Sequence, residues 1–475
     1  MGTYLFYDVE TSGLSPAFDQ ILTFACILTD PYLNEIERHS ITVRMRPDII
    51  PSPHAFITHR LKPSDLRDAM CEFDAIRKIH ELVNRPNTQS IGYNSLGFDD
   101  DFLRFSFYRN LFDPYAHQYA NGCFRGDMLP LAALYRVFAP DVLDWPELEG
   151  KPTLKLEYIC QANDFETSGK AHEAMADVEA LVAMTRAFAG KPEMWRYGMS
   201  FYDKKEDLKR LATLGTSWSL SNQISYPMGI MVSPSFGAKS GYISPVIRIG
   251  NSIPYKNQSL WLRLDHPDIV NIDEESRLYQ WFVIRKRPAD QWLVLPCLDR
   301  FWQRISDEAK EIVAENLSQF TQAPERFLKT VRHHESFAYP EVPNIDPDSA
   351  LYQDGFFSFG EKREIASFFA TKSIGEKIAA VGKMESWRVK VLASRILERN
   401  YPEAGDMGFS ASEYQEHLKK VNFATGDVVG YKGDTKYTAE QCRRHMDEIL
   451  GDEGALDEEQ KAVLEDLQAY LAELI

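Results

Sequence analysis

The chain has 475 residues, of which 44% are hydrophobic, and it carries a net charge of −17 at pH 7. A chain of this size can bury large cores, so we expect two or three domains. No stretch approaches the length of a membrane-spanning helix, and the N-terminus shows neither a basic flank nor a signal-like apolar core. We therefore expect a cytoplasmic protein that binds no membrane.

Residues 1–195 alternate apolar runs typical of strands with amphipathic stretches typical of helices. This alternation predicts an α/β domain, in which functional side chains gather at the ends of strands. The predicted strands are Tyr4–Val9, Ile21–Leu28, Ser40–Val43 and Ser90–Tyr93, and the predicted helices are Ala75–Leu82, Phe102–Arg109, Leu129–Val137 and Glu173–Phe188.

Beyond Gly190-Lys191-Pro192 the pattern changes to short β-like runs separated by Pro, Gly and Asn turns. Residues 200–340 are compatible with a small β-barrel followed by two helices, and residues 345–475 are predicted to be helical. The β-like runs are Gly229–Val232, Tyr242–Ile249, Leu260–Leu264, Trp281–Ile284 and Trp292–Leu295, and the helices include Asp307–Phe320, Ala323–His333 and Ala455–Ile475.

The charge distribution indicates where an anionic partner could bind, and the cysteine spacing bears on disulfides and zinc. Residues 440–475 contain 11 acids and 3 bases, whereas residues 204–341 contain 18 bases and 16 acids, so the middle segment is the better place for an anionic partner. The cysteines form no C-x-x-C pair and no disulfide framework, which predicts reduced thiols and no zinc site. They are Cys26, Cys71, Cys123, Cys160, Cys297 and Cys442.

Two acids end the first predicted strand. Asp8 and Glu10 are two positions apart, so they lie on the same side of that strand. Two close carboxylates at the end of a buried strand repel each other and lose hydration, a cost that a divalent cation removes. The alternative is that both side chains turn out into solvent at the following turn, Thr11-Ser12-Gly13.

A third acid, Asp177, lies within the apolar stripe of the predicted helix Glu173–Phe188. An unpaired acid that faces the core is costly, so we expect Asp177 to meet a metal ion. His172 lies about 140° round an ideal helix from Asp177, which places it at the helix entry or in the preceding loop. A histidine there suits a general base that takes a proton from water, and the alternative is a helix-start histidine without chemistry.

Three consecutive acids, Asp99, Asp100 and Asp101, open the predicted helix that runs through Phe102 and Phe107. Acids in a first turn complement the helix dipole and cap free amides, which accounts for at least two of the three. The pattern itself does not show which of them turns inward.

These residues together resemble the DEDDh exonuclease family, named for four acids and a histidine in three motifs. Asp8-Val9-Glu10-Thr11 is similar to the first motif, Asn94 through Asp99 to the second, and His172 with Asp177 to the third. The resemblance selects Asp99 among the three helix-opening acids. Further segments resemble the bacterial exonuclease I group: Gly92-Tyr93-Asn94, Phe107-Tyr108-Arg109-Asn110, Asp113-Pro114-Tyr115-Ala116, Ala174-Met175-Ala176, Leu351-Tyr352 and Gly355-Phe356-Phe357.

The resemblance implies a ribonuclease-H-like α/β core over residues 1–195, a Src-homology-3-like barrel over 200–340 and an α-helical C-terminal domain over 345–475. It implies processive 3′-to-5′ hydrolysis of single-stranded DNA to 5′-mononucleotides, in DNA repair and recombination. Two Mg²⁺ ions, replaceable by Mn²⁺, would be held by four acids while His172 activates water. These acids are Asp8, Glu10, Asp99 and Asp177.

The resemblance also implies contacts with the DNA and with a partner. Besides Glu10, the basic residues Lys155 and Arg104 and the aromatic residues Tyr115 and Tyr119 fall at substrate-contact positions, where bases would stack on the rings. The alternative for each is an ordinary surface cation or a half-buried aromatic. The acidic C-terminal tail of the single-stranded-DNA-binding protein would dock on the chain, which we expect to be a monomer.

Basic clusters interleaved with tryptophans in the middle segment predict either a groove for DNA or exposed cations around a tryptophan-rich core. The clusters are Lys204-Lys205, Lys209-Arg210 and Arg285-Lys286-Arg287, and the tryptophans are Trp281, Trp292 and Trp302.

Two other functions stay open. One is a 3′-to-5′ exoribonuclease, because no motif reads the 2′-hydroxyl and because Val9, Ser12 and Leu14 are closer to the wider family than to the exonuclease I group. The other is a non-catalytic nucleic-acid-binding scaffold, which is disfavoured because all five chemical positions are present.

Overall fold

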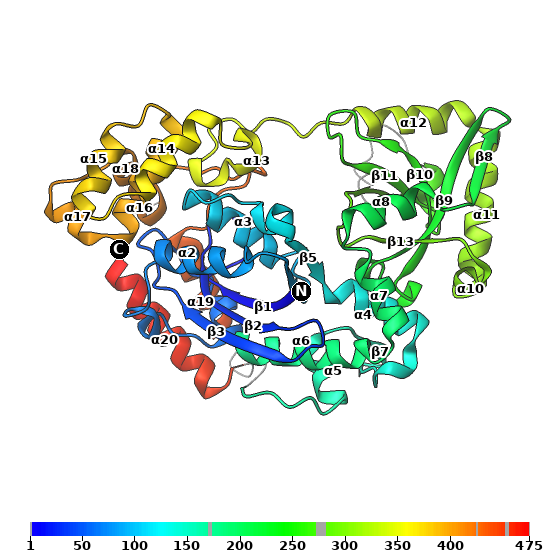
Figure 1. Cartoon of the computed structure of the whole chain (residues 1–475), viewed down its shortest axis with the longest axis horizontal. Helices are drawn as coiled ribbons and strands as arrows, with labels where there is room; N and C mark the ends of the chain where they lie inside the picture. Colours follow the sequence, from blue (N-terminus) through cyan, green and yellow to red (C-terminus); the bar gives the residue numbers. More distant parts are fainter. Residues whose placement is uncertain (1, 170–172, 272–281, 424–425, 452–455, 475) are drawn as a thin grey trace. The chain divides into compact units, whose positions relative to one another are not determined.

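The structure is a computed structural model that describes residues 2–169, 173–271, 282–423, 426–451 and 456–474 (Figure 1). It contains two compact units. The first comprises Met1–Phe124, Thr167–Glu179 and Glu341–Ile475, and the second comprises Arg125–Glu166 and Ala180–Pro340. Within the described ranges, no helix combines the length and the apolar character that crossing a bilayer requires.

A mixed sheet forms the centre of the first unit. Its central strand, β1 (Thr3–Thr11), pairs antiparallel with β2 (Ile21–Thr29) and parallel with β4 (Thr88–Gly92), and β3 (Glu35–Thr42) pairs antiparallel with β2. Leu5 of β1 has no exposed surface, as expected of a central strand covered on both faces. The prediction of a buried first strand is therefore confirmed.

Two helices, α2 (Glu72–Val83) and α3 (Asp99–Arg109), lie against one face of this sheet (Figure 1). Ile76 of α2 and Leu103 of α3 belong to the same hydrophobic core as Leu5 of β1. The remaining elements of this part are α1 (Pro53–His59), β5 (Phe124–Asp127), which starts where the unit's first segment ends, and α6 (Ala174–Ala189), which begins in the first unit and continues into the second.

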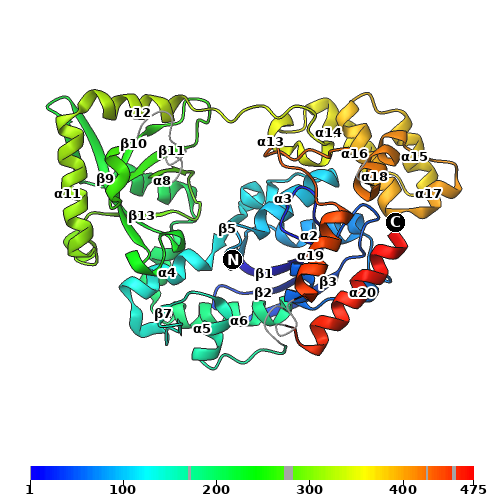
Figure 2. The same cartoon turned by 180° about the vertical axis from the view of Figure 1, so that it is seen from behind.

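The segment Glu341–Ile475 adds a group of helices to the first unit (Figures 1 and 2). Phe368 and Leu392 of this segment share a hydrophobic core with Phe73 of α2 and Tyr108 of α3. The helices are α13 (Leu351–Asp354), α14 (Phe359–Phe369), α15 (Ile374–Gly382), α16 (Trp387–Asn400), α17 (Pro402–Asp406), α18 (Ser412–Phe423), α19 (Ala439–Leu450) and α20 (Glu458–Leu474).

The second unit is built on a six-stranded antiparallel sheet with the order β12-β11-β10-β9-β13, in which β8 also pairs with β9. Phe320 of α11 (Asp307–Gln322) and Phe327 of α12 (Pro324–Ser336) pack into one core with Leu262 of β11. The strands are β8 (Ser217–Ser221), β9 (Ile224–Val232), β10 (Ile243–Asn251), β11 (Ser259–Arg263), β12 (Val283–Lys286) and β13 (Leu293–Pro296).

The other elements of the second unit are short or peripheral to this sheet. They are α4 (Met128–Phe138), β6 (Glu147–Leu148), β7 (Lys151–Pro152), α5 (Leu156–Ala162), α7 (Pro192–Met199), α8 (Lys204–Ala212) and α10 (Asp299–Trp302).

The predicted fold class, an α/β core with β-rich and helical additions, is confirmed. The predicted strand Ser40–Val43 is too short, because β3 begins at Glu35. The first half of β3 is an exposed edge rich in charged side chains, which strands at sheet edges commonly carry and which hide the strand pattern. The division into domains at residues 1–195, 200–340 and 345–475 stays a prediction.

Candidate active site

Three carboxylates meet at the end of β1. Asp8 and Glu10 lie on this strand and Asp177 lies in the first turn of α6. Each offers one oxygen, and these oxygens all lie within 4.8 Å of one another. All three residues are partly exposed, so the group is accessible from solvent.

The local structure explains why these acids converge. Asp8 and Glu10 share one side of β1, whereas Val9 between them is buried on the other side. Asp177 enters the group from the start of α6, where its neighbour Val178 is fully buried and fixes the helix against the core. An acid in the first turn also complements the positive end of the helix dipole.

Asp99, the first residue of α3, is the fourth acid at this place. It is 5% exposed, and its charge is among the causes that raise the pKa of both Asp8 and Glu10. The structure therefore brings together the four acids that the sequence singled out, from β1, α3 and α6.

The two acids that follow Asp99 have other partners. Asp100 pairs with Arg104 and with His117, whose Nε2 lies 2.8 Å from its carboxylate. Asp101 accepts a hydrogen bond of 3.0 Å from the hydroxyl of Tyr352. The structure thus distinguishes three acids that the helix pattern left equivalent.

The electrostatics of the group favour a cation. Burial and then repulsion from Asp99, Glu10 and Asp177 raise the pKa of Asp8 well above its usual range. Burial and then repulsion from Asp177 and Asp99 likewise raise the pKa of Glu10. A divalent cation would offset this repulsion, and an all-oxygen donor set is the one that hard divalent cations prefer. The residues therefore fit a divalent metal ion.

His172, the predicted general base, lies outside the described residues. Its neighbour Glu173 immediately precedes α6 and accepts the backbone N–H of Asp177 at 3.2 Å. The role of His172 stays a prediction.

The comparisons with known proteins agree with this site. A family model described as "Exonuclease" matches residues 5–185, a range that contains all five predicted chemical positions. Exodeoxyribonuclease I of Escherichia coli is 27% identical over an alignment that covers 100% of this chain and 98% of its own length. The chain is similar over its full length to exonuclease I and contains an exonuclease-family domain over residues 5–185. The resemblance seen in the motifs is therefore confirmed.

A second relative and two solved structures are also similar to this chain. Exodeoxyribonuclease I of Haemophilus influenzae is 33% identical over 215 residues, which cover 44% of this chain and 45% of the relative. A crystal structure of E. coli exonuclease I with single-stranded DNA and zinc has a TM-score of 0.81 and 24% identity, and covers 100% of this chain and 99% of that chain. A structure of exonuclease I described as apo gives a TM-score of 0.80. This likeness confirms the fold.

The basic residues that were predicted to contact DNA lie in different parts of the exonuclease. Lys155 belongs to the second unit, where it precedes α5 and its ammonium group lies 5.8 Å from the centre of the Tyr158 ring. Arg104 belongs to the first unit and pairs with Asp100 and, at 2.8 Å, with Asp101. Because two acids already compensate its charge, Arg104 offers less to a phosphate than an exposed arginine would.

The aromatic residues Tyr115 and Tyr119 lie on the first unit, where the ring of Phe356 packs against Tyr115. Tyr119 is 56% exposed. Phe356, which is 70% exposed, packs edge-on against Tyr115 with 5.4 Å between the ring centres. In the sequence analysis Phe356 stood only within the family resemblance of Gly355-Phe356-Phe357, because a phenylalanine next to a glycine is a weak signal for a binding role.

One of the basic clusters of the middle segment does not form an open groove. Lys286 is 1% exposed and lies 2.9 Å from Asp207 and 3.0 Å from Asp290. The groove prediction is wrong for this residue, because the buried Asp207 and the partly exposed Asp290 hold its charge inside the second unit.

A second group of possible metal ligands, Asp48, Asp348 and His417, is buried in the first unit. Arg399 lies 2.8 Å from Asp48 and 2.5 Å from Asp348. Burial raises the pKa of Asp48, but Arg399 and Arg46 outweigh burial and hold it well below its usual range. Because cations already neutralise these acids, we assign the group to an internal network of ion pairs.

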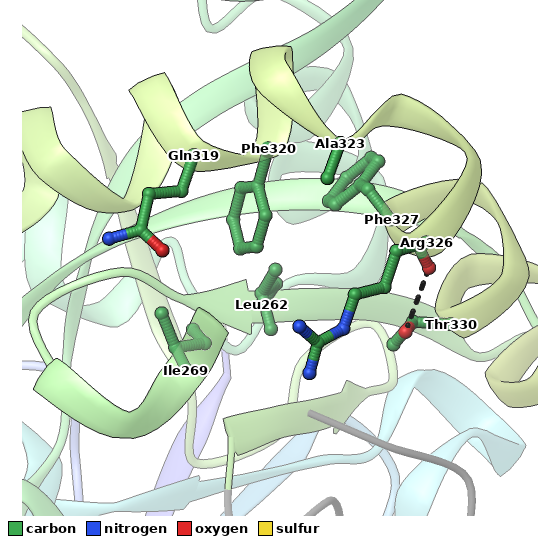
Figure 3. Close-up of a pocket in the computed structure, with 8 residues that line it drawn as sticks. All are labelled: Leu262, Ile269, Gln319, Phe320, Ala323, Arg326, Phe327 and Thr330. Atoms are coloured by element: carbon green, nitrogen blue, oxygen red, sulfur yellow. Dashed lines mark hydrogen bonds between the residues drawn. The ribbon is translucent and has the colours of Figure 1, made fainter. Parts of the chain in front are cut away.

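A small pocket lies between β11, α11 and α12 of the second unit (Figure 3). It has a volume of about 60 Å³, and Phe320 and Phe327 form much of its wall. Its lining contains no acid and no histidine, so it offers no ligands for metal-dependent catalysis. The other lining residues are Leu262, Ile269, Gln319, Ala323, Arg326 and Thr330.

Asp8→Asn is expected to raise the thermal stability of the metal-free exonuclease, because it removes one of several repelling charges. The expected gain in the free energy of unfolding is about 0.5–2 kcal/mol, measured by thermal melting in EDTA. Mn²⁺ is expected to raise the melting temperature of the wild type more than that of the variant, because ligands stabilise the state that binds them.

Glu465→Gln, on the exposed side of α20, serves as the matched control. It should change neither the melting temperature in EDTA nor the rise of that temperature with Mn²⁺. An Asp8→Asn variant that melts below the wild type in EDTA and gains as much from Mn²⁺ would contradict the assignment of a metal site.

Proposed function

We propose that this chain is an exodeoxyribonuclease that degrades single-stranded DNA processively from its 3′ end to 5′-mononucleotides, in DNA repair and recombination. One observation carries the proposal. Four acids converge at the end of β1 in a chain related over its full length to E. coli exodeoxyribonuclease I. Structures of E. coli exonuclease I contain a dA16 or a dT13 oligonucleotide, which supports the same class of substrate here.

The proposed cofactor is a pair of Mg²⁺ ions, for which Mn²⁺ substitutes. Asp8, Glu10 and Asp177, with oxygens within 4.8 Å of one another, and the adjacent Asp99 would hold them. Bound metal ions supply charge that stabilises the attacking and the leaving oxygens of an in-line displacement at phosphorus. The close acids suit this role because they repel one another when no cation is present.

The remaining chemistry is a hydrolysis at the last phosphodiester bond. The oxygen of a water molecule bonds to phosphorus, and the bond from phosphorus to the 3′-oxygen of the preceding nucleotide breaks. The product is a 5′-mononucleotide and a strand shortened by one residue. We assign His172 as the general base that takes the proton of this water, a task that suits a pKa near neutrality.

We propose that the strand is held by stacking and by basic residues. The first unit offers the paired rings of Tyr115 and Phe356 and the separate ring of Tyr119, and Tyr119 and Phe356 are well exposed. Lys155 and Arg104 are the proposed basic contacts, and Glu10 also contacts the terminal nucleotide. Stacking tolerates any base, as a nuclease without sequence preference requires.

We further propose a cytoplasmic monomer that docks the acidic C-terminal tail of the single-stranded-DNA-binding protein. All six cysteines are free, which suits a reducing compartment. Exposed basic side chains, among them Lys204 and Arg287 of the second unit, provide charge of the sign that an acidic tail needs.

A time course on 5′-labelled single-stranded DNA, duplex DNA and single-stranded RNA tests the function. We expect release of mononucleotides from single-stranded DNA with Mg²⁺ and none with EDTA. His172→Ala should lower the rate by about 10²- to 10⁴-fold, the usual contribution of a general base, and Asp8→Ala should abolish cleavage.

The control Glu465→Ala should cleave as the wild type does. Preferred cleavage of RNA would replace the proposal with an exoribonuclease, and binding of DNA without cleavage would leave a scaffold.

Phe356→Ala is expected to weaken the binding of single-stranded DNA while leaving kcat nearly unchanged. Loss of one stacking contact of about 1–3 kcal/mol corresponds to a rise of about 5- to 150-fold in Kd, measured by fluorescence anisotropy with Ca²⁺ in place of Mg²⁺. Tyr32→Ala, at an equally exposed ring on the turn between β2 and β3, is the control. An unchanged Kd for Phe356→Ala would remove this residue from the binding surface.

A further inference from the structure

The loop between β1 and β2 follows directly on the acid Glu10. This active-site loop, residues 12–20, is closed by the carboxylate of Asp19, which accepts hydrogen bonds from the Ser12 hydroxyl at 3.0 Å and the Ser15 N–H at 2.8 Å. The register of β1 against β2 shifts between Glu10 and Thr11, so the strand is irregular where the loop begins. Only Thr11 separates Glu10 from this loop.

Packing inside the loop leaves little freedom for another arrangement. A Cβ atom on Gly13 would lie 2.5 Å from Oδ2 of Asp19, so a larger residue at this position displaces the carboxylate. The Ser12 hydroxyl also accepts the N–H of Gln20 at 3.0 Å, and the Ser12 N–H donates to the Gln20 carbonyl at 2.9 Å. Asp19 and Ser12 thus join the two ends of the loop.

Three buried cations contact the backbone of this loop. The Phe18 carbonyl accepts hydrogen bonds from Arg46 at 3.0 Å and from Lys436 at 3.5 Å. The Ala17 carbonyl accepts one from Arg109 at 3.3 Å. The Lys436 ammonium group also lies 5.2 Å from the centre of the Phe18 ring. These cations hold the loop from the protein interior.

Lys436 differs from the other two cations in its origin. Arg46 follows β3 and Arg109 ends α3, whereas Lys436 lies between α18 and α19 of the C-terminal segment. It is 6% exposed. Burial lowers the pKa of Lys436 to about 8 and Asp48 opposes this shift, so the side chain is mostly charged at pH 7.

The buried ion pairs extend from these cations into the C-terminal helices. Asp48 lies 3.9 Å from Lys436, 3.0 Å from Arg46 and 2.8 Å from Arg399 of α16. Apolar packing of the same shape stabilises a fold at least as well as buried ion pairs do, so such pairs are poor evidence for stability alone. Buried ion pairs do fix the local geometry, because each charged group must lie close to its partner.

We propose that Lys436 is a positioning residue for the candidate active site. It holds Phe18 and Asp19, and through Asp19 and Ser12 it fixes the backbone that carries Glu10. The C-terminal segment is therefore part of the catalytic core. This inference rests on the proposed function, since Glu10 is taken as a metal ligand.

Lys436→Met in the full chain tests the role, with Lys432→Met as the matched control. Lys432 is an exposed lysine of the same segment. The expected result for Lys436→Met is a concentration of Mg²⁺ for half-maximal activity that is about tenfold higher, with a KM for DNA within about twofold of the wild type. The Kd for Mn²⁺ without DNA, measured by electron paramagnetic resonance, should rise by a similar factor.

Ser12→Ala is a second variant that removes no charged group, and the Asp19 carboxylate keeps its hydrogen bond from the Ser15 N–H. The substitution breaks the link from Asp19 to the strand end, so it should shift the metal dependence in the same direction as Lys436→Met. Because both changes act through one loop, the double variant should show less than the product of the two single effects.

A Lys436→Met variant that melts earlier than the wild type but binds Mn²⁺ and uses Mg²⁺ as the wild type does would overturn the proposal, since Lys436 would then serve stability alone. A wild type that binds Mn²⁺ but leaves DNA intact would contradict the proposed function, and the Kd for Mn²⁺ would still decide the role of Lys436.

Discussion

The repulsion between carboxylates at the end of β1 is the constraint on which the first unit depends. Asp8 and Glu10 are held close to Asp99 and Asp177, and each of these neighbours raises the free energy of the ionised pair. Contacts within a single strand or helix do not offset this free energy of repulsion. The apolar packing of β1, α3 and the start of α6 holds the acids in place. An unfavourable arrangement at a functional site persists only when the surrounding structure fixes it in this way.

The buried arginines of the same unit pair with acids other than those at the end of β1. Arg46 and Arg109 compensate Glu72, and Arg399 compensates Asp48, so these acids are neutralised within the protein. The acids at the end of β1 instead repel one another. One unit therefore contains two acidic groups of opposite character, of which one is closed by arginines and the other is suited to a metal ion.

The C-terminal helices belong to this arrangement as much as the sheet does. Their apolar side chains share a core with α2 and α3, and Lys436 and Arg399 carry the ion pairs from that core to the loop behind Glu10. The helical segment thus packs against, and forms ion pairs with, the unit that contains the four acids.

Sequence reasoning predicted β1, β2, β4, α2, α3 and α6 to within a few residues, and the acids on β1 and α6, because the period of apolar residues encodes both strand faces and helix stripes. It did not predict α1 or β5. It could not choose among Asp99, Asp100 and Asp101 without the family resemblance. The choice depends on His117 and Arg104, whose side chains pair with the Asp100 carboxylate in the folded chain.

The buried ion network was not predictable either. Arg46 and Arg399 are distant in the sequence, and no local pattern states that both meet Asp48. The exposed ring of Phe356 could be predicted only as a family feature, because its packing against Tyr115 joins two distant segments. Long-range partners of charged and aromatic side chains are thus the part that composition and periodicity leave open.

The central claim is that the acids at the end of β1 bind the metal ions of a nuclease. Anomalous X-ray scattering from crystals grown with Mn²⁺ and a 5′-mononucleotide tests it most directly. The account predicts manganese peaks about 2.0–2.3 Å from carboxylate oxygens of Asp8 and its neighbours. Manganese bound only at Asp48, Asp348 and His417, or at no carboxylate of β1, would contradict it.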